Sequence, residues 1–233
     1  MVYAVLLSGG IGTRTGYDIP KQFIEINGKP LLAYCIEKFV IIDAFKKIIV
    51  SSPKEYLDET KELVRDHFPN EGRIDVILGG ETRQDTLMNS IQYVNEIKDS
   101  DDAIIINHDA ARIFVSADQI EKCIEFTEIH GAASPVIPST DVMVEARGND
   151  VLRMPNRYEM FHVQTPQGFR INEYLDLYSN LSPEEIESVH EIIRVYFLND
   201  KDVCLFEGDK GNFKVTTSTD IRISKALLND VND

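Results

Sequence analysis

The apolar run Val2-Tyr-Ala-Val-Leu-Leu7 and the stretch Ser8-Gly-Gly-Ile-Gly-Thr-Arg14 that follows it decide the fold of this chain. Six apolar residues that end at glycines are typical of a β-strand buried on both faces. Three glycines within four residues allow the backbone to approach a ligand closely and to turn its N–H groups toward an anion. The sequence therefore predicts a buried strand followed by a candidate anion-binding loop.

Four more apolar runs follow, and segments of helical pattern separate them. The predicted strands cover residues 2–7, 47–52, 74–78, 103–107 and 132–137, and the predicted helices cover 30–40, 54–67, 83–97 and 117–129. In the third helix, Leu87, Ile91 and Val94 have the spacing of a buried stripe. Strands and helices that alternate in this way predict an α/β fold, with a Rossmann-like, mostly parallel sheet covered on both faces.

This regular alternation ends near residue 138. From Pro138 to Gln167 the chain has little helical periodicity, which predicts a β-arm at about 138–167 that projects from the sheet. After it we expect helices at 171–180 and 183–195, a strand at 202–206, and a last helix that reaches Leu228. Thr217-Ser-Thr-Asp220 resembles a capping box at the start of that helix. Residues 1–233 are expected to form a single domain with this arm.

The composition excludes several classes of function. The chain has 24 Lys and Arg residues against 39 Asp and Glu, a formal net charge of −15, whereas nucleic-acid and membrane-surface proteins need a basic face. No run approaches the ~20 apolar residues of a membrane-spanning helix. Three widely spaced cysteines suggest neither a disulfide framework nor a zinc site, and no signal peptide is recognisable. We therefore expect a cytoplasmic protein with no nucleic-acid or membrane partner.

The glycine-rich loop differs from the two standard phosphate-binding motifs. A dinucleotide fingerprint would need glycine where Thr15 stands, and a P-loop would need Ser or Thr at the end of Gly28-Lys-Pro30. The loop has instead Arg14 at its end and Lys21 in Pro20-Lys-Gln-Phe23, two cations suited to flank a nucleotide triphosphate. From the loop alone, a nucleotide site and a plain turn with two surface cations are equally good interpretations.

The sequence resembles the cytidylyltransferases that join CTP to a sugar-alcohol phosphate. Five motifs in the family's order, spread from residue 3 to about 228, carry the resemblance: SGGIGTR at 8–14 with PKQF at 20–23, GGETR at 79–83, HDAAR at 108–112, QTPQ at 164–167 and NFKVT at 212–216. The resemblance implies a nucleotidyltransferase fold of the glycosyltransferase-A-like kind. It also implies transfer of a cytidylyl group from CTP, with release of pyrophosphate.

The resemblance further implies a set of site residues. Arg14, Lys21 and Lys214 would be the catalytic cations, which stabilise the charge of the transition state. The implied contacts to CTP are Leu7, Ser8, Gly9, Gly10, Gly12, Thr13, Gly79, Gly80, Asp85 and Thr86, and those to the polyol phosphate are Arg112, Arg157 and Thr165. Family members dimerise through the arm, so that Arg157 and Thr165 would serve the neighbour's pocket in a homodimer.

Asp109 follows the predicted strand at 103–107 and therefore lies at the carboxyl edge of a parallel sheet, where ligands usually bind. A carboxylate at this position suits Mg²⁺ that bridges nucleotide phosphate oxygens. From its position alone, a structural or helix-capping aspartate is an equally good interpretation. The reaction needs no general base, because the attacking phosphate monoester is largely ionised at neutral pH.

Two branches of this family share the motifs. One uses 2-C-methyl-D-erythritol 4-phosphate in isoprenoid synthesis, and the other uses ribitol 5-phosphate for teichoic acid or capsule polymers. Asn156-Arg-Tyr-Glu-Met160 and the stretch from Leu175 to Pro183 resemble the ribitol branch more closely. We therefore predict D-ribitol 5-phosphate as the acceptor, giving CDP-ribitol, with the methylerythritol reaction as the alternative.

Departures from the family pattern fall around the expected acceptor pocket. Ile113 replaces the usual proline, Val142 the usual threonine, and Val189-His190 the usual Thr-Asp pair, whereas the CTP motifs are intact. The sequence thus predicts cytidylyl transfer more firmly than it predicts the acceptor. Outside the enzymes, the alternative is a regulatory subunit that binds CTP without turnover.

Overall fold

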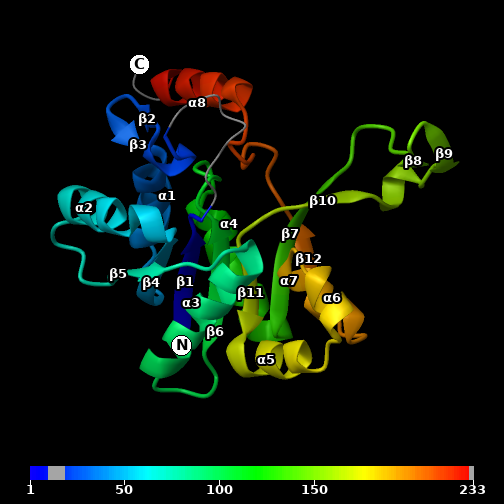
Figure 1. Ribbon diagram of the computed structural model, residues 1–233, viewed down its shortest axis with the longest axis horizontal. Helices are drawn as coiled ribbons and strands as arrows, with labels where there is room; N and C mark the ends of the chain where they lie inside the picture. Colours follow the sequence, from blue (N-terminus) through cyan, green and yellow to red (C-terminus); the bar gives the residue numbers. More distant parts are fainter. Residues whose placement is uncertain (10–18, 231–233) are drawn as a thin grey trace.

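The apolar run at the start of the chain forms β1 (Val2–Leu7), which lies in the middle of the sheet (Figure 1). The structure, a computed structural model, describes residues 1–9 and 19–230. β1 pairs in parallel with β4 (Phe45–Ser52) on one side and with β6 (Ile104–Asp109) on the other, and β4 pairs in parallel with β5 (Ile74–Leu78). These four strands confirm the predicted parallel half of the sheet.

The other half of the sheet mixes directions. β11 (Gln167–Arg170) runs antiparallel between β6 and β7 (Ala132–Pro138), β10 (Phe161–Val163) is antiparallel to β7, and β12 (Cys204–Glu207) is parallel to it. The strand order is β10-β7-β11-β6-β1-β4-β5, with β12 also on β7. The short strands β10 and β11 were not predicted, because segments of three and four residues give little periodicity.

Helices cover both faces of the sheet, as predicted. α1 (Leu31–Val40), α2 (Leu57–His67), α4 (Ala117–His130) and α8 (Ser218–Asp230) pack on the face reached by Val2, Ala4 and Leu6. α3 (Arg83–Ile97), α5 (Ile171–Ser179) and α7 (Ile192–Leu198) pack on the face reached by Tyr3, Val5 and Leu7. Because neighbouring β1 side chains alternate between the two cores, a fully apolar strand is required there.

The helix predicted at 183–195 is wrong as a single element. The segment forms α6 (Pro183–Glu187) and α7, separated by residues 188–191, although apolar residues recur through it at helical spacing. Ser182 caps the start of α6, and Glu191 before α7 has extended backbone angles. The break is stabilised from outside, because Arg83 Nη1 donates to His190 O at 2.9 Å.

The arm projects from the sheet as predicted, but it is shorter. β7 continues to Pro138 and β10 pairs back with it, so only residues 139–160 leave the sheet, and Ser139 N donates to Met160 O at 2.9 Å where they do. The projecting part contains the two-stranded hairpin of β8 (Glu145–Arg147) and β9 (Asp150–Arg153) and the short helix η4 (Arg157–Glu159) (Figure 1).

Short elements complete the chain. The 3-10 helix η2 (Lys21–Phe23) and the strands β2 (Glu25–Ile26) and β3 (Lys29–Pro30) precede α1, and η3 (Lys54–Tyr56) precedes α2. The predicted capping box is present, because Thr217 N and Asp220 N each donate to the other residue's side chain. None of the helices in residues 1–9 and 19–230 has both the length and the apolar character needed to cross a bilayer.

Candidate active site

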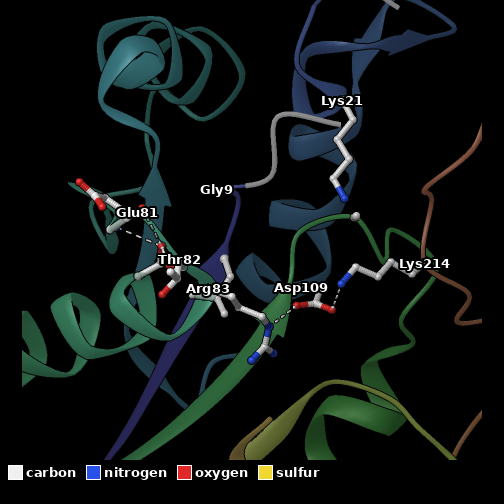
Figure 2. A pocket seen from close by; sticks show the side chains of 11 residues that line it. Gly9, Lys21, Glu81, Thr82, Arg83, Asp109 and Lys214 are labelled. Atoms are coloured by element: carbon white, nitrogen blue, oxygen red, sulfur yellow. Dashed lines mark hydrogen bonds and ion pairs between the residues drawn. The ribbon is translucent and has the colours of Figure 1, made fainter. Parts of the chain in front are cut away.

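A pocket opens at the carboxyl ends of β1 and β6, next to the amino end of α3 (Figure 2). It brings together seven of the residues that the sequence singled out: Leu7, Gly9, Lys21, Gly80, Thr86, Asp109 and Lys214. Segments far apart in the chain thus meet at the edge of the sheet where ligands bind in α/β proteins.

Asp109 lies at the centre of a cluster of cations. Its carboxylate is 2.7 Å from Lys214 Nζ, 3.3 Å from Arg83 Nε and 3.9 Å from Arg112 Nε, and its side chain is only 8% exposed. Figure 2 shows Arg83 and Lys214 reaching Asp109 from opposite sides. Burial alone would raise the pKa of this carboxyl, but Arg83, Lys214 and Arg112 outweigh burial and hold the pKa well below its usual range. Asp109 is therefore ionised at neutral pH.

Local structure explains how these four residues meet. Asp109 is the last residue of β6, and a turn in which Arg112 N donates to Asp109 O brings Arg112 back beside it. Arg83 is the first residue of α3, and Lys214 lies in the loop between β12 and α8. That loop is joined to the turn, because Val215 N donates to Ala111 O at 2.9 Å.

His108 and Thr165 hold the turn at residues 109–112 through hydrogen bonds. Nε2 of His108 is 3.0 Å from Arg112 O, and because a carbonyl only accepts, this nitrogen carries the proton. Nδ1 therefore accepts from the Thr165 hydroxyl at 2.9 Å, and the same hydroxyl oxygen accepts from Asp109 N at 3.1 Å. Burial lowers the pKa of His108 to about 4, against the hydrogen bond to Arg112 O, so the ring is neutral at pH 7.

This network engages Thr165, which was assigned to the arm from the sequence, within its own chain. Thr165 is 2% exposed and lies between β10 and β11, where its hydroxyl is used within its own chain. Arg157, by contrast, lies on η4 of the arm, is exposed, and donates to the Tyr158 hydroxyl at 2.9 Å.

The glycine pair after β5 has a clear structural role. Gly80 N donates to Thr86 Oγ1 at 3.0 Å, and Thr86 Oγ1 donates to Thr82 O at 2.8 Å. A Cβ on Gly80 would lie 2.3 Å from the Asp85 Cβ, so only glycine fits. Gly79 N donates to Ser52 O, which continues the pairing of β4 and β5.

Two predicted contacts to CTP have their side chains engaged elsewhere. The Asp85 carboxylate accepts from Thr82 N and Thr82 Oγ1 and caps α3, while Ser8 Oγ donates to Ser51 O at 2.6 Å and joins the ends of β1 and β4. The predicted residues Gly10, Gly12, Thr13 and Arg14 lie outside the described residues.

The departures from the family pattern do not form one pocket. Ile113 and Val189 are core residues with 2% and 3% exposure, and Val142 is exposed on the arm. The carbonyl of His190 accepts a hydrogen bond from Arg83. Val189 and His190 both line a hollow beside Arg83, and the expectation that the departures lie around the acceptor pocket stays a prediction.

Sequence reasoning missed Arg83 and Glu191. Arg83 is the last residue of the GGETR motif, and a cation directly after the glycine pair was the signal that could have marked it as a site residue. Its Nη2 is 3.2 Å from Glu191 Oε2, so Arg83 links Asp109 to the break before α7. Burial raises the pKa of Glu191, while Arg83 opposes that rise. Nothing in the sequence pattern signalled Glu191, because it stands in an apparent helix.

The residues around Asp109 fit Mg²⁺ in one way only. Within the part of the chain that the structure describes, no three His, Cys, Asp or Glu side chains gather in a group suited to hold a metal ion. Asp109 supplies a single ionised carboxylate, which is enough for Mg²⁺ when phosphate oxygens and waters complete its six ligands. Any such ion has to share this carboxylate with Lys214 and Arg83.

Lys and Arg side chains gather around one ionised carboxylate at the carboxyl edge of a parallel sheet, and such cations are suited to bind nucleotide phosphates. Fold and site together define a nucleotidyltransferase. Residues 2–230 match the family described as IspD: 2-C-methyl-D-erythritol 4-phosphate cytidylyltransferase. The chain belongs to this family of CTP-dependent cytidylyltransferases, which favours an enzyme over a regulatory subunit.

Solved structures agree with this assignment. The chain is similar to the Francisella tularensis 2-C-methyl-D-erythritol 4-phosphate cytidylyltransferase, with 27% identity, a TM-score of 0.79, and coverage of 97% of this chain and 98% of that one. The 4-diphosphocytidyl-2C-methyl-D-erythritol synthase of Anaerococcus prevotii has 23% identity and a TM-score of 0.80, with 98% and 96% covered. The 2-C-methyl-D-erythritol 4-phosphate cytidylyltransferase of Thermus thermophilus has 24% identity and a TM-score of 0.73, with 97% and 98% covered. The preference for the ribitol branch finds no support among them.

The ion pairs of Asp109 predict a pH-dependent stability. Because its pKa in the fold lies below the ~3.9 of an unfolded aspartate, its stabilisation is complete above about pH 5 and is lost as the pH falls toward the folded pKa. We expect the stability difference between wild type and Asp109→Asn to shrink by about 1 kcal/mol from pH 6 to pH 3. Urea denaturation in EDTA measures it, and a difference that stays constant would contradict the ion-pair account.

Proposed function

We propose that the chain transfers the cytidylyl group of CTP to 2-C-methyl-D-erythritol 4-phosphate and releases pyrophosphate. The observation that carries this proposal is the match of residues 2–230, nearly the whole chain, to the family of that name. The named solved structures add support, because each is described by the same reaction or its product. The acceptor is thus the one that sequence reasoning held as its alternative.

In this reaction an oxygen of the acceptor phosphate attacks the α-phosphorus of CTP, and the bond from that phosphorus to the bridging oxygen of pyrophosphate breaks. The attacking monoester has a second pKa near 6 and is already largely ionised at pH 7, so no general base is required. The site agrees with that requirement, because His108, next to Asp109, is buried, neutral and hydrogen-bonded at both ring nitrogens. The protein's task is to position two polyanions and to stabilise the crowded charge.

Lys21 and Lys214 are the residues we assign to the phosphates. Both line the pocket, Lys21 from η2 and Lys214 from the loop before α8. Lys214 would contact the phosphate that attacks or is transferred, and Lys21 the phosphates of CTP. Arg14, outside the described residues, takes its role from the resemblance alone. Asp109 keeps Lys214 and Arg83 in place before substrate binds, because it pairs with both.

Arg112 is assigned to the acceptor phosphate. Its side chain is 13% exposed, its Nη1 donates to Asn212 O at 2.8 Å, and its Nε is buried without a hydrogen-bond partner among the described residues. Burial lowers the pKa of Arg112, while Asp109 opposes that fall, and the guanidinium stays charged at neutral pH. A fixed, partly desolvated guanidinium is suited to bind a phosphate through charge-assisted hydrogen bonds.

Asp109 is also the residue we assign to Mg²⁺. When bound, the ion would act as a Lewis acid that neutralises nucleotide phosphate charge. The support is the ionised state and pocket position of this carboxylate.

We also propose a homodimer formed through the arm. Six large apolar side chains of the arm have exposed fractions from 51% to 77%: Val142, Val144, Val151, Leu152, Met154 and Tyr158. Apolar surface gathered on a projecting hairpin is typical of an interaction site. Arg157, on the same arm, would then reach the partner's pocket.

The acceptor is tested by steady-state turnover with CTP and either 2-C-methyl-D-erythritol 4-phosphate or D-ribitol 5-phosphate, with pyrophosphate release as the readout. We expect kcat/KM to be at least about tenfold higher with the methylerythritol compound, because each missing or misplaced hydroxyl contact weakens transition-state binding. A higher value with ribitol 5-phosphate would reject this acceptor and restore the first prediction. No release with either would reject both.

Replacing Lys214 tests its role. We expect Lys214→Ala to lower kcat by about 10²–10³-fold, as for other residues that stabilise transition-state charge. The free energy of unfolding should change by no more than about 1 kcal/mol, because Arg83 and Arg112 still neutralise Asp109. Lys210→Ala removes an exposed lysine of the same loop and should keep wild-type kinetics. Wild-type turnover in Lys214→Ala would overturn the assignment.

The arm proposal is tested by the mass in solution. Light scattering should give twice the chain mass of 26.4 kDa for the wild type and a single chain for Leu152→Glu, because a charge in an apolar interface is unpaired. Ile129→Glu, on an exposed apolar position of α4, is the matched control and should remain a dimer. A monomeric wild type would refute the proposal.

A further inference from the structure

The position of Lys214 depends on contacts from outside its own segment. Lys214 lies in residues 208–217, which join β12 to α8 without helix or strand. A segment of this kind has no ladder of its own backbone hydrogen bonds to fix it. Yet Lys214 Nζ lies 2.7 Å from Asp109. Contacts from outside the loop therefore fix its position relative to β6.

The amide of Gln164 supplies three of the hydrogen bonds that hold the loop. Its Nε2 donates to Asp209 O at 2.8 Å and to Asn212 O at 3.2 Å, and its Oε1 accepts from Asp209 N at 3.1 Å. Gln164 is 3% exposed, so these bonds are shielded from water. The loop is shaped to receive this side chain, because a Cβ on Gly208 would lie 2.5 Å from Gln164 Oε1.

Gln164 is itself fixed in the sheet. It directly follows β10, and its backbone N donates to Pro135 O of β7 at 2.9 Å. The next residue, Thr165, accepts from Asn212 Nδ2 at 2.8 Å through its carbonyl and from Asp109 N through its hydroxyl. Two consecutive residues therefore anchor both partners of the pair between Asp109 and Lys214.

We propose that Gln164 is a positioning residue for the reaction: it ties the loop at 208–213 to the sheet and so holds Lys214 beside Asp109. The role in catalysis rests on the function proposed above for Lys214. The positioning itself does not, because it is a statement about where the Lys214 amine lies.

Loss of the Gln164 amide should loosen the loop without unfolding it. Val215 N still donates to Ala111 O, and the Phe213 ring still stacks on Phe114 with centroids 5.1 Å apart. Lys210 and Gly211 are exposed, so water can reach the loop. Gln164→Met keeps the volume of the side chain and removes its hydrogen bonds. Gln167→Met is the matched control, since Gln167 is fully buried in the same QTPQ motif but donates to Ser134 Oγ instead.

The first test needs no turnover. The wild-type enzyme and both variants are treated briefly with an amine-acetylating reagent, and mass spectrometry gives the rate of modification at Lys214 relative to Lys210. We expect this ratio to rise at least about threefold in Gln164→Met, because the loop then opens locally more often, and to stay unchanged in Gln167→Met. An unchanged ratio in Gln164→Met, with the protein folded by circular dichroism, would overturn the proposal.

The second test is a double-mutant cycle on kcat. We expect Gln164→Met to lower kcat about tenfold with CTP and acceptor saturating, and to have little further effect when Lys214→Ala is already present. Equal losses in both backgrounds would show that Gln164 acts elsewhere and would overturn its role through Lys214. If Lys214→Ala alone keeps full activity, the catalytic assignment fails, and the acetylation ratio still decides whether Gln164 positions the amine.

Discussion

The buried carboxylate of Asp109 and its cations are the interaction on which the site depends. One negative charge, 8% exposed, is shared by Lys214, Arg83 and Arg112, which come from the loop before α8, from α3 and from the turn after β6. Without Asp109 these cations would repel one another in a partly desolvated pocket. With Asp109 present, the three cations stay close together, and the cluster presents a net positive charge to a ligand. A protein with a net charge of −15 can thus present a local site for polyanions.

The parallel half of the fold could be predicted because its signals are local and strong. Val2–Leu7 is apolar throughout since both faces of β1 are covered, and Leu87, Ile91 and Val94 mark the buried stripe of α3. Asp109 could be placed at the ligand edge of the sheet for the same reason, since it follows a predicted strand. The family resemblance then supplied Lys21 and Lys214, which the structure brings to the same pocket.

The rest depends on contacts between distant segments, which periodicity does not encode. The break between α6 and α7 is stabilised by Arg83, more than 100 positions away in the chain, through the carbonyl of His190. Thr165 was expected on the arm, but its hydroxyl bonds Asp109 N and His108, a pairing visible only once β11 lies beside β6. Asp85 was expected at the nucleotide, and local helix capping takes its carboxylate instead.

The arm leaves and rejoins the sheet between two neighbouring strands. Phe161 of β10 faces Pro138 of β7, and Ser139 and Met160 are joined by a backbone hydrogen bond, so the two ends of the projecting segment are already closed upon one another. A loop whose ends are held together in this way can change in length at little entropic cost to the domain. Residues 139–160 can therefore change in length or sequence while the sheet and the Asp109 cluster keep their shape.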